Sequence, residues 1–177
     1  TQNESQRIIA SSDDLIALFN SKIISMTSKD QVKPLIQELI SVAQLPENQG
    51  NHAVQLYRAM LEPMKHMESI VWRFRNIIEK SGVLHMQALS AIRKMYYQDY
   101  MYGPHIKAIL DYLVEPSKDL LQFNNAGQAQ DFLNLNIKPT LYKSLSSVNK
   151  ILANADKDWS FEFDAYLVSG YDAASNK

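Results

Sequence analysis

The sequence contains no cysteine, and this absence removes several kinds of chemistry at once. Without a thiol the chain can form no disulfide, no thiol nucleophile and no cysteine-ligated zinc or iron–sulfur site. Glycine is scarce as well, with 5 in 177 residues, which argues against the many tight turns of an all-β sandwich. No stretch of about 18 apolar residues is present, so the sequence predicts no transmembrane segment.

An excess of charge of one sign is also missing, because 18 basic residues face 19 acidic ones. A net charge of −1 gives no long-range attraction to nucleic acid or to an anionic membrane, and neither is expected as a partner. The sequence has no nucleophile elbow, zinc-protease motif, phosphate-binding glycine loop or dinucleotide fingerprint. We therefore expect a protein that is not an enzyme, although a triad assembled from distant residues would leave no such motif.

What is present is the composition of one folded domain, with 46% hydrophobic and 21% charged residues. A chain of this length suits a single domain, and we expect one helical domain over residues 1–177. The polar start, Thr1-Gln2-Asn3-Glu4, fits a mature protein exported to the periplasm or the cell exterior after signal cleavage. It fits an arbitrary chain boundary equally well, so both interpretations stay open.

Apolar side chains return every third or fourth residue along most of the chain, the spacing of helices that bury one face. This spacing predicts helices over residues 13–26, 30–44, 51–80, 84–102, 104–114, 117–123, 128–135 and 139–153. The expected fold is all-α, a compact bundle of about six to eight helices.

The predicted helix over residues 51–80 carries the most regular apolar row and is expected to be the central element. Pro63 lies in its middle and should kink this long helix or split it. The row consists of Leu56, Met60, Met64, Met67, Val71, Phe74 and Ile78. Methionine fills irregular gaps in hydrophobic cores, so we interpret the row as packing rather than as a cofactor site.

Two features near the C-terminus complete the predicted pattern. The helix over residues 139–153 carries an apolar row in helical register, formed by Leu141, Leu145, Val148 and Leu152. After it, Trp159, Phe161, Phe163 and Ala165 alternate with polar residues, which indicates an extended aromatic segment. The sequence does not decide whether residues 159–165 dock within the chain or pair with a partner chain.

Metal binding is an alternative function. Glu62 and His66 are four residues apart, which places them on one side of a helix, and His85 is a further histidine at helical spacing. Met64 could serve as a soft ligand for copper or haem. Two ligands do not make a site, however, and we interpret Glu62 and His66 as a solvated helix surface and His85 as a core histidine. No cofactor is predicted.

The tyrosine-rich stretch is the favoured binding surface. Tyr97 and Met101 lie on a different side from the inward row of their helix, Tyr100 lies at the border, and Tyr102 and His105 flank a Gly-Pro break. Large amphipathic side chains that the core cannot absorb either cover a second layer or bind a partner.

Three functions follow, in order of preference. The first is a non-enzymatic binding or adaptor protein that uses the tyrosine-rich patch for a protein or small-molecule partner. The second is a metal- or haem-binding helical bundle with histidine, methionine and glutamate ligands. The third, ranked last, is an enzyme with a dispersed site.

Overall fold

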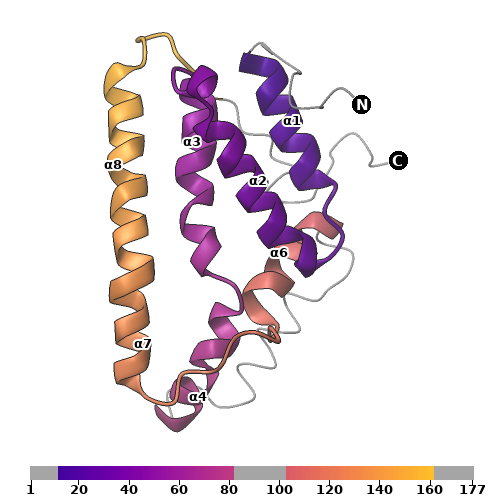
Figure 1. Ribbon diagram of the computed structural model, residues 1–177, viewed down its shortest axis with the longest axis vertical. Coiled ribbons are helices and arrows are strands. Elements are labelled where there is room, and N and C mark those ends of the chain that lie inside the picture. Colours follow the sequence, from indigo (N-terminus) through magenta and orange to yellow (C-terminus); the bar gives the residue numbers. More distant parts are fainter. Residues whose placement is uncertain (1–11, 82–102, 162–177) are drawn as a thin grey trace.

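The computed structural model describes residues 12–81 and 103–161, and all regular structure in these ranges is helical (Figure 1). This confirms the all-α expectation. The helices are α1 (Ser12–Ile24), α2 (Val32–Gln44), α3 (His52–Leu61), α4 (Ile70–Ser81), α6 (Pro104–Val114), α7 (Ala126–Phe132) and α8 (Lys138–Asn154). Short 3-10 turns occur at η2 (Lys29–Gln31), η3 (Pro46–Asn48) and η4 (Pro63–His66), and a π-helical turn, η5 (Leu133–Ile137), joins α7 to α8.

Several predicted helix ends match the structure, while other predicted segments differ from it. Asn51 caps α3 by accepting a hydrogen bond from the backbone N–H of Val54 at 3.2 Å. Pro104 is the first residue of α6, where its missing N–H costs nothing. Residues 117–123 were expected to be helical but form no helix, and residues 84–102 lie outside the described ranges. No helix among the described residues is long and apolar enough to cross a membrane.

The hydrophobic core lies where α1, α2, α3 and α6 meet. Phe19 of α1, Leu39 of α2 and Tyr57 of α3 are all essentially inaccessible to solvent. The rings of Phe19 and Tyr57 meet edge to face with 5.6 Å between their centroids. The tyrosine hydroxyl donates a hydrogen bond to the side-chain carbonyl of Asn20, so its one polar atom is satisfied inside the core.

The predicted helix over residues 51–80 is two helices, α3 and α4, separated by η4, which begins at Pro63. Proline removes a backbone donor and crowds the preceding turn, which explains why the α-helix ends there. Ser69 then adopts a left-handed backbone with φ of 55°, although it is buried. Its N–H donates to the carbonyl of Tyr112 at 2.7 Å, which ties the break to α6.

This break overturns the prediction that the methionine row forms the central stripe. Met60 and Val71 are 47% and 44% exposed, and the other members of the row are only partly buried. The buried face of α3 instead carries Ala53, Val54, Tyr57, Ala59 and Leu61. Both rows have helical spacing within α3, and no single face continues past Pro63 because the helix ends there.

The apolar row of α8 has the predicted helical spacing, and it faces outwards. Leu141, Leu145 and Leu152 are 40%, 59% and 58% exposed, whereas Ser144 and Ile151 are buried. Helix α8 packs along α3 at the edge of the bundle, as Figure 1 shows. Its less apolar side therefore faces α3, and its leucines face outwards.

The first residues after α8 turn back over the start of α3. The ring of Phe161 lies 5.4 Å from that of Tyr57, and Phe161 packs against the core. Trp159 meets the ring of His52 edge to face at 6.1 Å. These contacts lie within the chain; Phe163 and Ala165 are outside the described residues.

Candidate anion-binding cleft between α3 and α8

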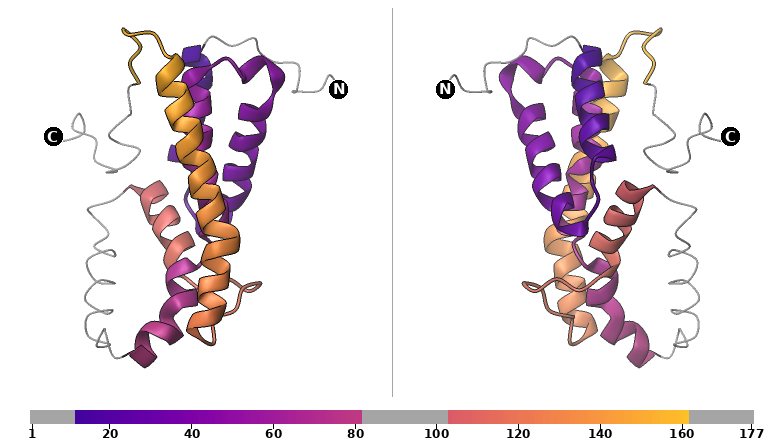
Figure 2. Two further views of the ribbon diagram at one scale, coloured as in Figure 1. Left: turned by 90° about the vertical axis from the view of Figure 1, so that its left-hand side faces the viewer. Right: turned by 90° about the vertical axis from the view of Figure 1, so that its right-hand side faces the viewer.

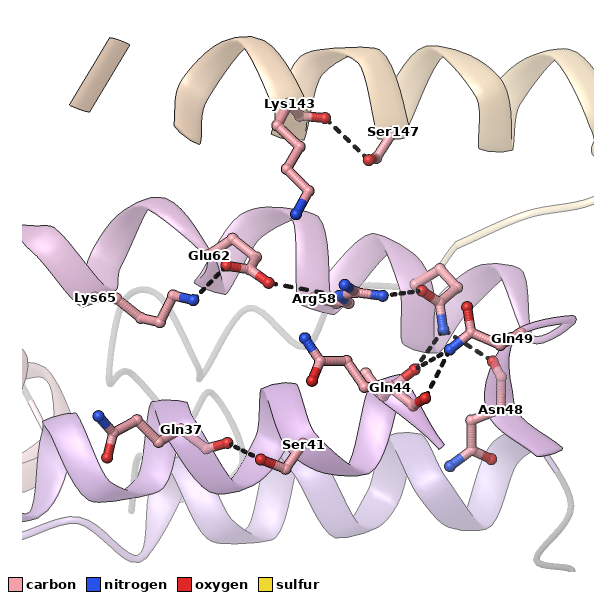
Figure 3. Close-up of polar contacts among 12 residues, drawn as sticks. Gln37, Ser41, Gln44, Asn48, Gln49, Arg58, Glu62, Lys65, Lys143 and Ser147 are labelled. Carbon is pink, nitrogen blue, oxygen red and sulfur yellow. Dashed lines mark hydrogen bonds and ion pairs between the residues drawn. The ribbon is translucent and has the colours of Figure 1, made fainter. Parts of the chain in front are cut away.

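A polar cleft of about 320 Å³ lies between α3 and α8. Figure 3 looks into this region and shows Lys143 reaching from α8 towards Arg58 and Glu62 on α3. The residues that line the cleft are Gln55, Arg58, Ala59, Glu62, Lys143, Ser144, Ser147, Lys150 and Ile151.

The spacing of polar residues on each helix explains how the cleft forms. On α8, Lys143, Ser147 and Lys150 are separated by four and three residues, which places them on one side of the helix. The small Ser144 on that side fills little space against α3. Two helices that face each other with small and long polar side chains cannot close as tightly as two apolar faces, so a cavity remains.

Among the described residues that line the cleft, Glu62 at the end of α3 is the only acidic one. Its carboxylate accepts Lys65 Nζ at 2.6 Å and lies 3.5 Å from Arg58 Nε. Burial alone would raise the pKa of this carboxyl, but the Lys65 hydrogen bond and the charges of Lys65, Lys143 and Arg58 outweigh it. The pKa of Glu62 is therefore held below its usual value, and the group is ionised at neutral pH.

Arg58 is oriented by its neighbours before any ligand arrives. Besides Glu62, its guanidinium contacts the side-chain carbonyl of Gln55 at 3.4 Å. The amide of Gln55 in turn donates to the backbone carbonyls of Ala43 and Asn48, at 2.7 and 2.9 Å. A guanidinium fixed on two sides loses less rotamer freedom when it binds an anion.

Lys143 and Lys150 are in a different situation, because neither forms a direct ion pair with any residue that the structure describes. Lys143 acts on Glu62 through its charge alone. The described part of the lining thus holds three cationic side chains and one carboxylate, and the carboxylate is already paired with Arg58 and with Lys65 beside the cleft. This surplus of positive charge favours an anion in the cleft.

The hydroxyl of Ser147 in the cleft is occupied by a hydrogen bond within α8. Ser147 Oγ donates its proton to the backbone carbonyl of Lys143 at 2.9 Å, as Figure 3 shows, so this hydroxyl is not activated by a base. Its oxygen remains able to accept a hydrogen bond from a ligand.

The residues predicted as metal ligands do not come together as a metal site in the described ranges. Glu62 is engaged by Arg58 and Lys65, as above. The pKa of His66 is lowered by burial and by the charge of Lys65, against a smaller opposite effect of Glu62. Among the residues that the structure covers, no three His, Asp or Glu side chains gather as a metal would require. His85 lies outside those residues.

The tyrosine-rich patch is largely outside the described ranges, which leave out Tyr97, Tyr100, Met101 and Tyr102. His105, the remaining member, is 0% exposed on α6. Its side chain therefore belongs to the interior and offers no surface to a partner. The patch formed by the other four residues stays a prediction.

A second, largely apolar pocket of about 160 Å³ opens at the edge of the core, lined by residues of α1, α2, α3 and α6. Met60 and Met64 line it together with Leu39 and Tyr57. The methionines are thus partly used as gap-fillers at the rim of the core, in keeping with their flexible side chains.

The cationic residues of the cleft were not singled out from the sequence. Half of the pattern could have been found in the sequence, since Lys143, Ser147 and Lys150 share a side of the helix predicted at 139–153. The other half, Arg58, is about 90 residues away in the chain, and only the packing of α8 on α3 brings Arg58 close to the lysines.

Comparison of the whole chain with known protein families, curated proteins and solved structures finds no match.

Proposed function

We propose that this chain is a non-enzymatic binding protein, and that its α3–α8 cleft holds an anionic group of the ligand. The observation that carries the proposal is the pair of lysines, Lys143 and Lys150, that line the cleft without a direct ion pair among the described residues. They lie with Arg58 around a space at the small end of the range for ligand sites.

The chemistry of the lining suits a compact oxyanion, a phosphate or a carboxylate. Arg58 offers a planar fork of donors that matches such a group, and the two lysines add mobile point charges. The fixed carboxylate of Glu62 excludes part of the cleft from anions and holds Arg58 in place. The cleft is small, so it would take the charged end of a ligand, with the remainder in solvent or on another surface.

The tyrosine-rich segment, Tyr97 to Tyr102, is proposed as the second contact for such a ligand or for a protein partner. Aromatic side chains there would supply apolar contact that the polar cleft lacks. This part of the proposal rests on the sequence.

Titration calorimetry of the full chain at low salt tests the cleft, with inorganic phosphate in one arm and acetate in the other. We expect phosphate to bind, and the double variant Lys143→Gln with Lys150→Gln to bind about 100-fold or more weakly, because each of the two lost charge-assisted contacts removes on the order of 1.5–3 kcal/mol. Tighter binding of acetate than phosphate would assign the site to carboxylates.

Lys118→Gln is the matched control, since Lys118 is an exposed lysine in the connection between α6 and α7, outside the cleft. It should bind phosphate as the unmodified chain does. Both cleft lysines are exposed on α8, so their replacement should leave the helical circular-dichroism signal unchanged. Equal binding by the double variant and the unmodified chain, or no binding of either anion, contradicts the proposal.

A further inference from the structure

The outer side of α8 carries an apolar row that no described segment covers. The row consists of Leu141, Leu145 and Leu152, each at least 40% exposed, with the half-buried Val148 between them. Tyr142, which follows Leu141 in the chain, is exposed as well, at 62%. In Figure 2 (left) α8 faces the viewer with no other helix in front of it.

The spacing of this row is that of a helix that pairs with another helix. Its members are separated by four, three and four residues, the a/d pattern with which two helices interdigitate over a common seam. Contiguous exposed apolar surface of this kind is uncommon on a monomer and marks a contact site. The expected occupant is therefore another amphipathic helix.

We propose that α8 pairs with α8 of a second copy of this chain, antiparallel and about a two-fold axis. When two copies run in opposite directions, Leu141 faces Leu152 of the second copy and Leu145 faces its Val148. Every contact then occurs twice, as a two-fold interface requires. The row is self-complementary in this register, with no polar side chain at its four positions.

The charges at the two ends of α8 favour the antiparallel direction. Lys138 begins the helix, and the exposed Asp156 and Asp158, with Lys157 between them, follow its end. In the antiparallel pair Lys138 lies near the two aspartates of the second copy, whereas a parallel pair would bring the two Lys138 side chains together. The macrodipoles of the two helices also favour opposite directions.

The size of the contact sets the strength of the dimer. Helix α8 has 17 residues and is about 25 Å long, so a single helix pair buries less than the roughly 800 Å² per partner of a standard interface. The dimer should therefore dissociate on dilution. The cleft lies on the other side of α8, so dimer formation and anion binding are separate properties and each test can fail alone.

Sedimentation equilibrium of the full chain over a range of concentrations tests the dimer. We expect reversible dimer formation, and Leu145→Glu should weaken it roughly 30-fold or more, since it places two charges at the centre of the seam. The control, Ser146→Glu, adds the same charge at an exposed position about 100° round the helix and should dimerise as the unmodified chain does. Helical circular dichroism should be unchanged in both variants, because both sites are exposed.

The absence of cysteine allows the register to be tested directly. A chain with Leu141→Cys and Leu152→Cys should form intermolecular disulfides on mild oxidation. Neither single variant should do so, because the two copies of each residue are separated by about 16 Å along an antiparallel pair. A chain that stays monomeric at all concentrations overturns the proposal, as does cross-linking of the single variants or a dimer that survives Leu145→Glu.

Discussion

The hydroxyl of Tyr112 on α6 donates a hydrogen bond to the backbone carbonyl of Met64 at 3.0 Å, across 48 residues of sequence. Met64 lies in η4, the turn that Pro63 forces between α3 and α4. The carbonyl of Tyr112 accepts the N–H of Ser69 at 2.7 Å on the other side of the same break. One residue of α6 thus satisfies backbone groups that the interrupted helix leaves open.

Tyr112→Phe should lower the free energy of unfolding by about 0.5–1.5 kcal/mol, because the Met64 carbonyl loses its hydrogen-bond donor in a partly buried position. Urea unfolding followed by circular dichroism measures this. Tyr142→Phe removes the hydroxyl of an exposed tyrosine and should leave the stability unchanged. Equal effects of the two changes would mean that the Tyr112 hydroxyl contributes nothing to closing the break.

The raised pKa of Tyr112 predicts a loss of stability at alkaline pH. Burial, with a smaller effect of the Glu68 charge, raises the pKa of Tyr112 to about 12. Since the folded pKa lies above the unfolded value of 10.0, its contribution is full below pH 10 and is lost as the pH rises towards 12. Unfolding measured across this range should show a smaller decline for Tyr112→Phe than for the unmodified chain. An identical decline would contradict the raised pKa.

Arg73 of α4 contacts the connection between α6 and α7 and the end of α7. Its guanidinium lies 4.3 Å from the ring centroids of both Phe123 and Phe132, and its Nε donates to the carbonyl of Leu121 at 3.2 Å. Arg73→Gln should therefore cost about 1–3 kcal/mol of unfolding free energy. Arg75→Gln, on the exposed side of the same helix, breaks only a surface ion pair and should cost less than about 0.5 kcal/mol.

The position of the core can be tested by comparing two truncations. Leu39→Ala, at a site 1% exposed, should destabilise the protein by about 2–5 kcal/mol through lost burial and a cavity. Met60→Ala, in the row that the sequence placed at the centre, should cost less than about 1 kcal/mol because Met60 is 47% exposed. Thermal or urea unfolding of both variants measures which of the two truncations costs more stability. The reverse order would restore the methionine row to the core.

The lowered pKa of Glu62 predicts that the protein loses stability in acid. Its pKa is lowered from the usual 4.5, so its ionised form contributes stability above that pH, and the contribution is lost as the pH falls through the lower folded value. Unfolding free energies at about pH 6 and about pH 3 should therefore differ more for the unmodified chain than for Glu62→Gln. The same difference in both proteins would mean that Arg58 and Lys65 do not stabilise the carboxylate.

The sequence predicts local structure well where the local chemistry decides it. The all-α class, the cap at Asn51, the break at Pro63 and the start of α6 at Pro104 all follow from residues and their neighbours. Which face of a helix is buried does not follow from the residues of that helix alone. Leu145 and Ile151 on α8 are both apolar, and only the packing of α8 on α3 turns the isoleucine inwards and the leucine outwards.

The candidate site was missed for a similar reason. Glu62 was recognised as part of an i, i+4 pair with His66, but its partners in the structure are Arg58 and Lys65, with Lys143 nearby on another helix. A charged residue on one helix has many possible partners in sequence, and tertiary packing selects among them. Helical periodicity predicts which side of one helix is apolar or polar, but it does not predict which other helix packs against that side.

An amide nitrogen–proton NMR titration of the full chain with inorganic phosphate tests whether the space between α3 and α8 holds an anion. Saturable shifts should concentrate at residues 55–62 and 143–151 and disappear in the double variant Lys143→Gln with Lys150→Gln. Shifts scattered over exposed lysines such as Lys118, unchanged in the double variant, would mean that this cleft binds no anion.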